Sequence, residues 1–374
     1  MKQSKYKVRY AVVGLGHIAQ KAVLPAFKRA QENSVLVALV SGHREKLDAL
    51  GHIYQIDRRY LYSEFEDCLK QKEVDAIYIC APNEHHRYFT ELAAKNGVHV
   101  LCEKPLALTV KDCESMIETA KKNDVKLMVA YRLYFEPANL KVMQLAYSKE
   151  IGDPRIFNSV FTIQVKDTDN IRLLDLDKGG GPLYDIGVYC INAARNLFKS
   201  EPTEVYAKSV SARESRFKKV DETVSCILKF PGGKIANFTV SLGAFPSADF
   251  DLIGTKGRIR LEKAYNYNSN VTLRIFEKGK TILKRFSRRD QFASEIHHFS
   301  DCILRNKSPK ANPYEGLIDI EIIEALHLSM DLDSPISLDE VQRRGPFQRA
   351  QETPRPFSLR EKIFNLNPLG GHKH

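Results

Sequence analysis

The stretch AVVGLGHIA at residues 11–19 decides the fold class of this chain. It joins a short run of β-forming residues to a segment in which apolar residues recur with helical spacing. Gly14 permits a tight turn, Gly16 lets a pyrophosphate approach the backbone, and Ala19 is small enough for the helix to pack on the strand. A tight turn without a ligand is the ordinary alternative. The flanking strand and helix favour a dinucleotide-binding turn, because a helix N-terminus attracts an anion.

The rest of the first third continues to alternate strands and helices. Strands are predicted at 8–13, 35–40, 60–62, 75–81, 98–102 and 126–130. Helices are predicted at 17–30, 43–50, 63–71, 85–96 and 109–123. Repeated βα units of this length predict an α/β fold with a parallel, doubly wound sheet. We therefore expect residues 1–130 to form a Rossmann dinucleotide-binding domain.

The pattern changes near residue 131. Further helices are predicted at 137–149, 183–198, 290–305 and 314–331. Further strands are predicted at 155–165, 203–210, 222–230, 234–242, 248–253, 257–262, 271–277 and 281–286. Consecutive strands with short turns predict an α+β domain with a mostly antiparallel sheet at 131–340. Residues 341–374 lack periodicity, and we expect a basic tail that is extended or disordered.

Composition narrows the class of function. The 374 residues carry a formal net charge of +11, but no basic stripe is interleaved with aromatic residues, so no nucleic-acid partner is expected. No run approaches the roughly 18 apolar residues of a membrane helix, and the N-terminus does not resemble a secretory signal. The seven cysteines lack any CxxC spacing, so no metal site is expected. These features together predict a cytoplasmic protein.

The residues after the second predicted strand bear on the cofactor. A site that prefers NAD usually has an acidic residue there, whereas this chain reads SGHREK at 41–46. The Ser41 hydroxyl and the cations of Arg44 and Lys46 would bind a 2′-phosphate, which an acid would repel. The ordinary alternative is that the two cations are solvated at a helix start. We expect NADP(H) in preference to NAD(H).

A lysine closes the fifth predicted strand, in the sequence EKP at 103–105. Ligands of a doubly wound sheet bind beyond the carboxyl ends of its strands. Most lysines are solvated surface groups, but this position predicts that Lys104 points at the nicotinamide end of a bound dinucleotide.

A second unusual stretch is GGGPLYDIGVY at 179–189. Asp185 and Tyr189 are four residues apart, so they share one face of the predicted helix. Hydride transfer from an alcohol needs a group that takes the hydroxyl proton, and a tyrosine beside a lysine can do so. A helix-capping aspartate and a core tyrosine are equally compatible with this spacing.

Five motifs together resemble the Gfo/Idh/MocA oxidoreductase family. They are AVVGLGHIA, VALVSGHREK, APNEHH, HVLCEKPLA and GGGPLYDIGVYCINAARNLF, in family order and spacing between residues 6 and 338. Tyr131-Arg132 with Pro137, and Tyr189, are most similar to the glucose–fructose oxidoreductase branch. The resemblance implies a second domain whose open sheet packs against another subunit, and hence a homodimer or homotetramer.

The resemblance also implies roles for individual residues. The cofactor-binding residues would be Gly14, Gly16, His17, Ile18 and Ala19 at the pyrophosphate, Ser41, Arg44 and Lys46 at the 2′-phosphate, and Ala81, Pro82, Asn83 and His86 at the ribose and nicotinamide. Glu103 and Lys104 would lie between the nicotinamide and the substrate, and Arg132 and Arg172 would reach the cofactor or substrate from the second domain. Catalytic residues would be Lys104, which supplies positive charge, Asp185, which orients a substrate hydroxyl, and Tyr189, which acts as acid or base.

The sequence therefore predicts an NADP-dependent oxidoreductase that transfers hydride between the nicotinamide and a carbon of a sugar or polyol. One alternative is a dehydrogenase that acts on a non-sugar cyclic diol. Another, of a different class, is a regulator that senses NADP without catalysis.

Overall fold

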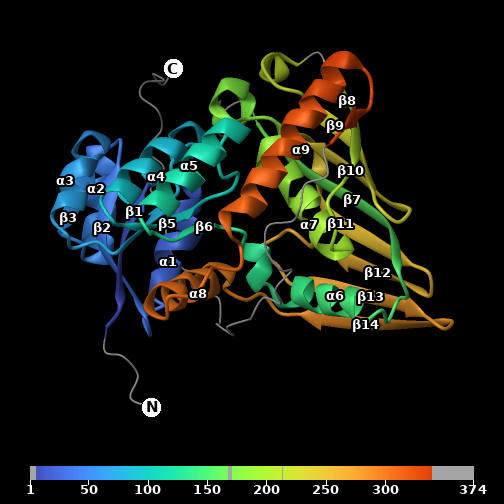
Figure 1. The fold of residues 1–374 in the computed structure, drawn as a ribbon, viewed down its shortest axis with the longest axis horizontal. Helices are drawn as coiled ribbons and strands as arrows, with labels where there is room; N and C mark the ends of the chain where they lie inside the picture. The colour runs from blue at the N-terminus through green and yellow to red at the C-terminus, as the bar shows by residue number, and fades with distance from the viewer. Residues whose placement is uncertain (1–5, 167–170, 213, 339–374) are drawn as a thin grey trace, which may run out of the picture.

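The computed structural model of the protein describes residues 6–166, 171–212 and 214–338. For residues 171, 172 and 177 it describes the main chain alone. The described residues form two sheets that lie side by side (Figure 1). The tail predicted at 341–374 lies outside the described residues.

Within the described residues, the first sheet has six parallel strands in the order β3-β2-β1-β4-β5-β6. They are β1 (Val8–Val13), β2 (Ser34–Ser41), β3 (Arg58–Leu61), β4 (Ala76–Ile79), β5 (His99–Cys102) and β6 (Leu127–Val129). The connections reverse direction across the sheet between β1 and β4, where a doubly wound sheet opens a crevice beyond its carboxyl ends. The predicted α/β fold is confirmed, and the crevice is where a site is expected.

Helices and helical turns cover both faces of this sheet. They are η1 (Ala19–Val23), α1 (Leu24–Phe27), α2 (Arg44–Tyr54), η2 (Tyr62–Glu64), α3 (Phe65–Lys70), η3 (Asn83–His85), α4 (His86–Lys95) and α5 (Val110–Lys122). The helix predicted at 17–30 is a π-helical turn followed by one short α-helical segment. Pro25 has no amide hydrogen to donate to the carbonyl four residues earlier, so regular α-helical bonding is interrupted there.

The second sheet has nine strands within the described part of the chain, in the order β14-β13-β12-β11-β7-β10-β9-β8-β15. They are β7 (Pro154–Gln164), β8 (Glu204–Val210), β9 (Thr223–Phe230), β10 (Lys234–Ser241), β11 (Gly243–Gly254), β12 (Gly257–Glu262), β13 (Val271–Glu277), β14 (Lys280–Phe286) and β15 (Ile336–Ser337). Strands β7 and β10 are parallel and all other neighbours are antiparallel, so the predicted mostly antiparallel sheet is confirmed.

Helices cover one face of this second sheet and leave the other face open (Figure 1). The remaining helical elements are η4 (Arg132–Phe135), α6 (Pro137–Tyr147), η5 (Ile171–Leu174), η6 (Leu176–Lys178), η7 (Leu183–Gly187), α7 (Val188–Phe198), η8 (Ser215–Phe217), α8 (Gln291–Leu304) and α9 (Pro313–Leu332). Alternate residues along β9 are buried and exposed, as expected for a sheet with one solvated face. Val160 and Ile227 are more than two-fifths exposed, and Phe245 is 88% exposed.

Helix α8 packs on the first sheet, although the chain reaches it after most of the second. The Ser300 hydroxyl lies 2.7 Å from the hydroxyl of Tyr10 on β1 and 2.7 Å from that of Ser34 on β2. At the start of the helix, the Asp290 carboxylate pairs with Arg29. Helix α8 therefore brings residues that follow β14 in the chain against the first sheet.

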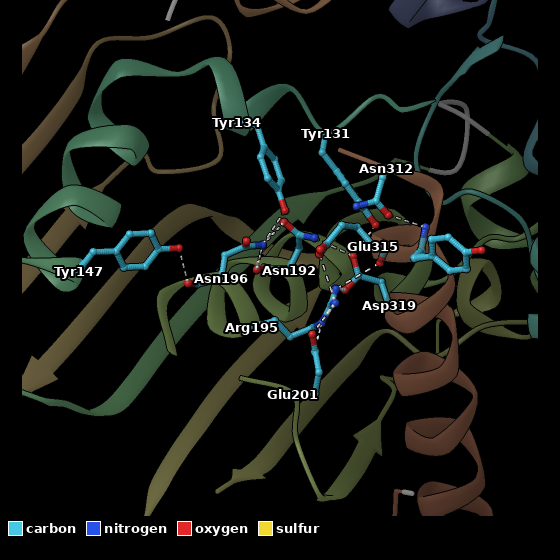
Figure 2. Close-up of polar contacts among 11 residues, drawn as sticks. Tyr131, Tyr134, Tyr147, Asn192, Arg195, Asn196, Glu201, Asn312, Glu315 and Asp319 are labelled. Carbon is cyan, nitrogen blue, oxygen red and sulfur yellow. Dashed lines mark hydrogen bonds and ion pairs between the residues drawn. The ribbon is translucent and has the colours of Figure 1, made fainter. Parts of the chain in front are cut away.

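A buried guanidinium joins the two domains, as Figure 2 shows. Arg195 on α7 is completely buried and donates to Glu201, at 2.5 and 3.0 Å, and to Asp319 on α9, at 2.5 Å. The second oxygen of Asp319 accepts from Asn192 and from the Tyr131 hydroxyl, which follows β6. A buried charge must be paired, so these contacts hold α7, α9 and the end of the first sheet together.

The turn after β1 lies directly against the end of β4. Gly14 has a φ of +94°, and its amide donates to the main-chain oxygen of Val40. A Cβ at Gly14 would come within 2.4 Å of the Ala81 amide nitrogen. By contrast, a Cβ at Gly16 would meet no atom within 4 Å. The structure thus requires glycine at position 14 for its own folding, but not at position 16.

We predict that Gly14→Ala lowers the free energy of unfolding by about 2–5 kcal/mol, because it combines an unfavourable φ with a backbone clash. The matched variant Gly16→Ala should change it by no more than about 0.5 kcal/mol. Denaturant unfolding of both variants measures the difference. Equal stability of the two proteins would contradict this account of the turn.

Candidate active site

The turn between β1 and the first helix has space for a phosphate. Gly16 is half-buried and a Cβ there would point into open space, while His17 is exposed at the mouth of the turn. Ile18 is half-buried, and Ala19 is completely buried under the sheet. The turn is braced from within by the Gln20 amide, which donates to the main-chain oxygen of Leu15 at 2.9 Å. The cradle at Gly16 fits the pyrophosphate of a dinucleotide.

The residues predicted to bind a 2′-phosphate lie at the end of β2 and the start of α2. The Ser41 hydroxyl is almost completely buried and accepts from the His43 amide at 3.3 Å, so it shapes the turn. Arg44 is about half exposed and pairs with Glu64 at 3.1 and 3.2 Å. Lys46 is half-buried. The structure therefore adds a carboxylate that competes with any phosphate for Arg44.

That carboxylate is itself held in place. Glu64 accepts from the amide of Leu61 at 2.7 Å, and this bond, followed by the Arg44 charge, lowers the pKa of Glu64. Glu64 is therefore anionic at neutral pH. Nothing in the sequence around position 64 suggested this contact, because the pairing depends on how β3 aligns beside β2.

Three of the predicted cofactor residues lie between β4 and α4, and a fourth, His86, begins α4. Ala81 is buried and Pro82 half-buried, beside the turn at Gly14. Asn83 is buried, and its side-chain amide donates to the main-chain oxygen of Gly179 at 3.0 Å. This bond joins the loop to the glycine-rich turn of the second domain, so Asn83 positions the two domains at the crevice.

The structure corrects the role expected for His86 at the ribose and nicotinamide. His86 is completely buried, with Nδ1 2.9 Å from the main-chain oxygen of Pro105 and Nε2 3.1 Å from that of Ala81. A side chain enclosed on all sides cannot touch a ligand in the crevice. His86 instead holds together the loops that follow β4 and β5.

Three predicted catalytic residues meet at the carboxyl end of β5. The Lys104–Pro105 peptide bond is cis. Lys104 Nζ donates to the main-chain oxygen of Asp185 at 2.6 Å and lies 3.5 Å from its Oδ1. The same nitrogen lies 4.9 Å from the ring centre of Tyr189. Asp185 and Tyr189 therefore share the side of the helix that faces Lys104, as their spacing predicts.

These charges lie in a partly dehydrated setting. The side chains of Lys104 and Asp185 are 13% and 18% exposed. Burial raises the pKa of Glu103, and the neighbouring Lys104 charge partly offsets that rise. Low exposure strengthens the interaction of a cation with any oxygen that gains negative charge.

Arg132 lies beside Tyr189, and its expected contact with cofactor or substrate stays a prediction. Its guanidinium is almost completely buried between the rings of Tyr189 and Tyr267, at 4.9 and 5.4 Å. It donates to Gln291 on α8 at 2.7 Å. Arg132 thus packs against the ring of Tyr189. The side chain of Arg172 lies outside the described residues, so its role stays a prediction.

Several residues near the site carry no motif and were missed by sequence reasoning. They are Tyr78, Tyr265, Tyr267, Gln291 and Glu295. Tyr78 alone offers a signal, because a tyrosine in a strand buried on both faces must find a partner for its hydroxyl. The other four come from a loop and a helix whose approach to the site depends on the tertiary fold.

Two further findings concern the described residues as a whole. They contain no group of three or more His, Cys, Asp or Glu residues that could hold a metal ion. Among them, no helix combines the length and the apolar character needed to cross a bilayer.

Comparison with known proteins covers both domains. Residues 8–131 match the family described as "Oxidoreductase family, NAD-binding Rossmann fold", and residues 139–260 match the "GFO/IDH/MocA C-terminal domain". A D-xylose 1-dehydrogenase (NADP(+)) from Haloarcula marismortui is 32% identical over 89% of this chain and 93% of its own. A trans-1,2-dihydrobenzene-1,2-diol dehydrogenase from Xenopus tropicalis is 26% identical over 85% of this chain and 95% of its own.

A solved structure agrees with these matches. The aldose-aldose oxidoreductase from Caulobacter crescentus, complexed with glycerol, is 35% identical and superposes with a TM-score of 0.84, covering 89% of this chain and 100% of that one. The two family models thus match this chain in order along its sequence. In this chain, Lys104 contacts both Asp185 and the ring of Tyr189 at the crevice. The chain therefore belongs to the Gfo/Idh/MocA family of NAD(P)-binding oxidoreductases.

Proposed function

We propose that this protein is an NADP-dependent oxidoreductase that transfers hydride between the nicotinamide and a sugar or polyol carbon. The observation that carries the proposal is the contact of Lys104 with Asp185 and with the ring of Tyr189, beyond the carboxyl end of β5. The relatives named for D-xylose and aldose substrates support the choice of substrate class.

Each of the three residues has a distinct task in the proposed reaction. The bound nicotinamide supplies or accepts the hydride. The Tyr189 hydroxyl takes the proton from a substrate hydroxyl, or returns one to a carbonyl oxygen. Lys104 stabilises the negative charge that develops on that oxygen, and the Asp185 carboxylate accepts from a neighbouring substrate hydroxyl. Arg132 keeps the Tyr189 ring in place.

The two alternatives from the sequence differ in what they require. A cyclic diol presents the same hydroxyl chemistry as a sugar, and one relative is named for such a substrate. A regulator that only senses NADP would not need a lysine beside a tyrosine and an aspartate. The arrangement of these side chains therefore favours an enzyme over a sensor.

The preference for NADP(H) over NAD(H) is part of this proposal. Arg44 and Lys46 lie at the start of α2, where the 2′-phosphate of a dinucleotide is expected. The relative from Haloarcula marismortui is named for NADP(+), which supports the choice. Glu64 weakens the preference for NADP(H), because its carboxylate forms an ion pair with the Arg44 guanidinium when no ligand is bound.

A second copy of this chain is the partner that we propose for the open face of the nine-stranded sheet. Phe245 on β11 and the apolar residues Val160 and Ile227 on that sheet are exposed, and burying them would favour association. A copy related by two-fold symmetry would cover the same patch on both subunits.

We also place the protein in the cytoplasm, because its seven buried cysteines form no disulfide. Cell fractionation tests this location.

We predict that Lys104→Ala and Tyr189→Phe each lower turnover by about 10²–10⁴, the usual contribution of acid–base catalysis. The dissociation constant for NADP(H) should stay close to that of the wild type. Steady-state assays with a panel of aldoses and polyols, including D-xylose, and free NADP(+) or NADPH measure the effect. Lys121→Ala and Tyr206→Phe are the matched controls outside the site. Full turnover in both site variants would rule out these roles.

For the cofactor, we predict that NADP(H) binds more tightly than NAD(H). Arg44→Ala should weaken the binding of NADP(H) about tenfold or more, because one charge-assisted hydrogen bond to the 2′-phosphate is lost. The binding of NAD(H), which has no 2′-phosphate, should be unchanged. Glu64→Gln should strengthen the binding of NADP(H), because it removes the carboxylate that pairs with the Arg44 guanidinium. Fluorescence titration of the wild type and both variants with each nucleotide gives the six dissociation constants. Tighter binding of NAD(H) to the wild type would refute the preference.

For the assembly, we predict that the wild type sediments as a dimer or tetramer. Phe245→Asp should lower the mass of the assembly that sediments. The carboxylate would be desolvated in the contact. Leu332→Asp, which places a charge at the end of α9, is the control and should leave the mass unchanged. A wild type that is monomeric at every concentration would contradict the proposed contact.

A further inference from the structure

Two carboxyl groups meet on a single hydroxyl beneath the crevice. The hydroxyl of Tyr78, on β4, lies 3.1 Å from Oε1 of Glu103 and 2.9 Å from Oε2 of Glu295, on α8. A tyrosine hydroxyl has one proton, and an ionised carboxylate can only accept. Shared between two carboxylates, that one proton makes two weak bonds and leaves two negative charges facing each other. A proton on one of the two carboxyl groups, donated to the tyrosine oxygen, makes both contacts full hydrogen bonds.

The surroundings decide which carboxyl group is protonated. Glu295 is completely buried, and its Oε1 has no hydrogen-bond partner among the described residues. Were it ionised, an anionic oxygen would lie in the interior without a donor, which is costly. Glu103 is only partly buried, and the positive charges of Lys104 and Arg132 face it. The proton therefore belongs on Glu295.

The charges around Glu295 agree with this assignment. Glu103 faces it across Tyr78, and Asp290 adds negative charge at the start of its own helix. The Cys80 thiol also faces it, and burial raises the pKa of that thiol, so it is neutral. Arg132 is the cation on this side, and it already donates to Gln291. Burial, followed by the charge of Glu103, raises the pKa of Glu295 well above its usual value.

We propose that Glu295 is a protonated positioning residue, which donates to the Tyr78 oxygen so that Tyr78 donates to Glu103. Glu103 is then the single carboxylate charge of the trio, next to Lys104 in the chain. No proton moves between Glu295, Tyr78 and Glu103 during the reaction. The bonds hold α8, β4 and the end of β5 in one arrangement, and they set the charge that Lys104 experiences. The effect on turnover rests on the proposed function, whereas the protonation itself does not.

Infrared spectroscopy tests the protonation directly. The wild type at neutral pH should show the C=O stretching band of a buried carboxylic acid that Glu295→Gln lacks. Asp301→Asn, the same chemical change at a partly exposed carboxylate of α8, should keep the band. Tyr78→Phe should shift the band to higher frequency, because the acid loses its acceptor. Unchanged bands in both Glu295→Gln and Tyr78→Phe would overturn the proposal.

The pH dependence of stability is a second test that needs no substrate. A carboxyl group that is protonated in the folded state and ionised in the unfolded state costs stability as pH rises above its unfolded pKa, about 4.3. Glu295→Gln removes that loss. The ratio of the folding constant of the variant to that of the wild type should therefore rise about tenfold per pH unit above that value. A ratio independent of pH would mean that Glu295 is ionised.

The positioning role has its own readout. In the wild type, turnover should fall at the alkaline pH at which the infrared band disappears. In Glu295→Gln, turnover should not fall at that pH. A fall at the same pH in both proteins would show that Glu295 does not set the charge near Lys104. If the sugar chemistry proposed above fails, the infrared and stability measurements still decide the protonation, so the two failures are distinguishable.

Discussion

The burial of one guanidinium is the constraint on which the arrangement of the domains depends. Arg195 is surrounded by protein, so its charge must be met by carboxylates at short distance. Asp319 on α9 supplies one of these and also binds the Tyr131 hydroxyl at the end of the first sheet. The helix that holds Arg195 also holds Tyr189, and Tyr131 directly precedes Arg132. A pairing remote from the crevice therefore sets how the two domains present their side chains to it.

Helix α8 provides the other support. It follows β14 in the chain, yet it packs on β1 and β2. Gln291 and Glu295 are four residues apart and so lie on one face of it. The first binds Arg132, which lies under the Tyr189 ring, and the second binds Tyr78, which leads to Glu103. The active-site groups are thus positioned by polar side chains that do not themselves reach the crevice.

How much of this could be predicted varies from residue to residue. Gly14 and Ala19 were predictable, since a turn that close to a neighbouring strand excludes larger side chains. Asp185 and Tyr189 were predictable as a pair because helical spacing places them on one face. The expected ligand contact of His86 was wrong, and the burial of Arg132 against Tyr189 was not foreseen. Residue type alone does not reveal burial, and both side chains are enclosed by segments distant in sequence.

The sequence by itself determined the βα alternation, the phosphate-binding turn, the change to an antiparallel sheet and the family. These follow from local patterns of apolar spacing, glycine and charge, which act over a few residues. The tertiary structure alone decided that Glu64 occupies Arg44, that Arg132 supports Tyr189, and that Tyr78 bridges two carboxyl groups. Each of these contacts joins segments brought together by packing, and the cost of burying an unpaired polar group determines which partners meet.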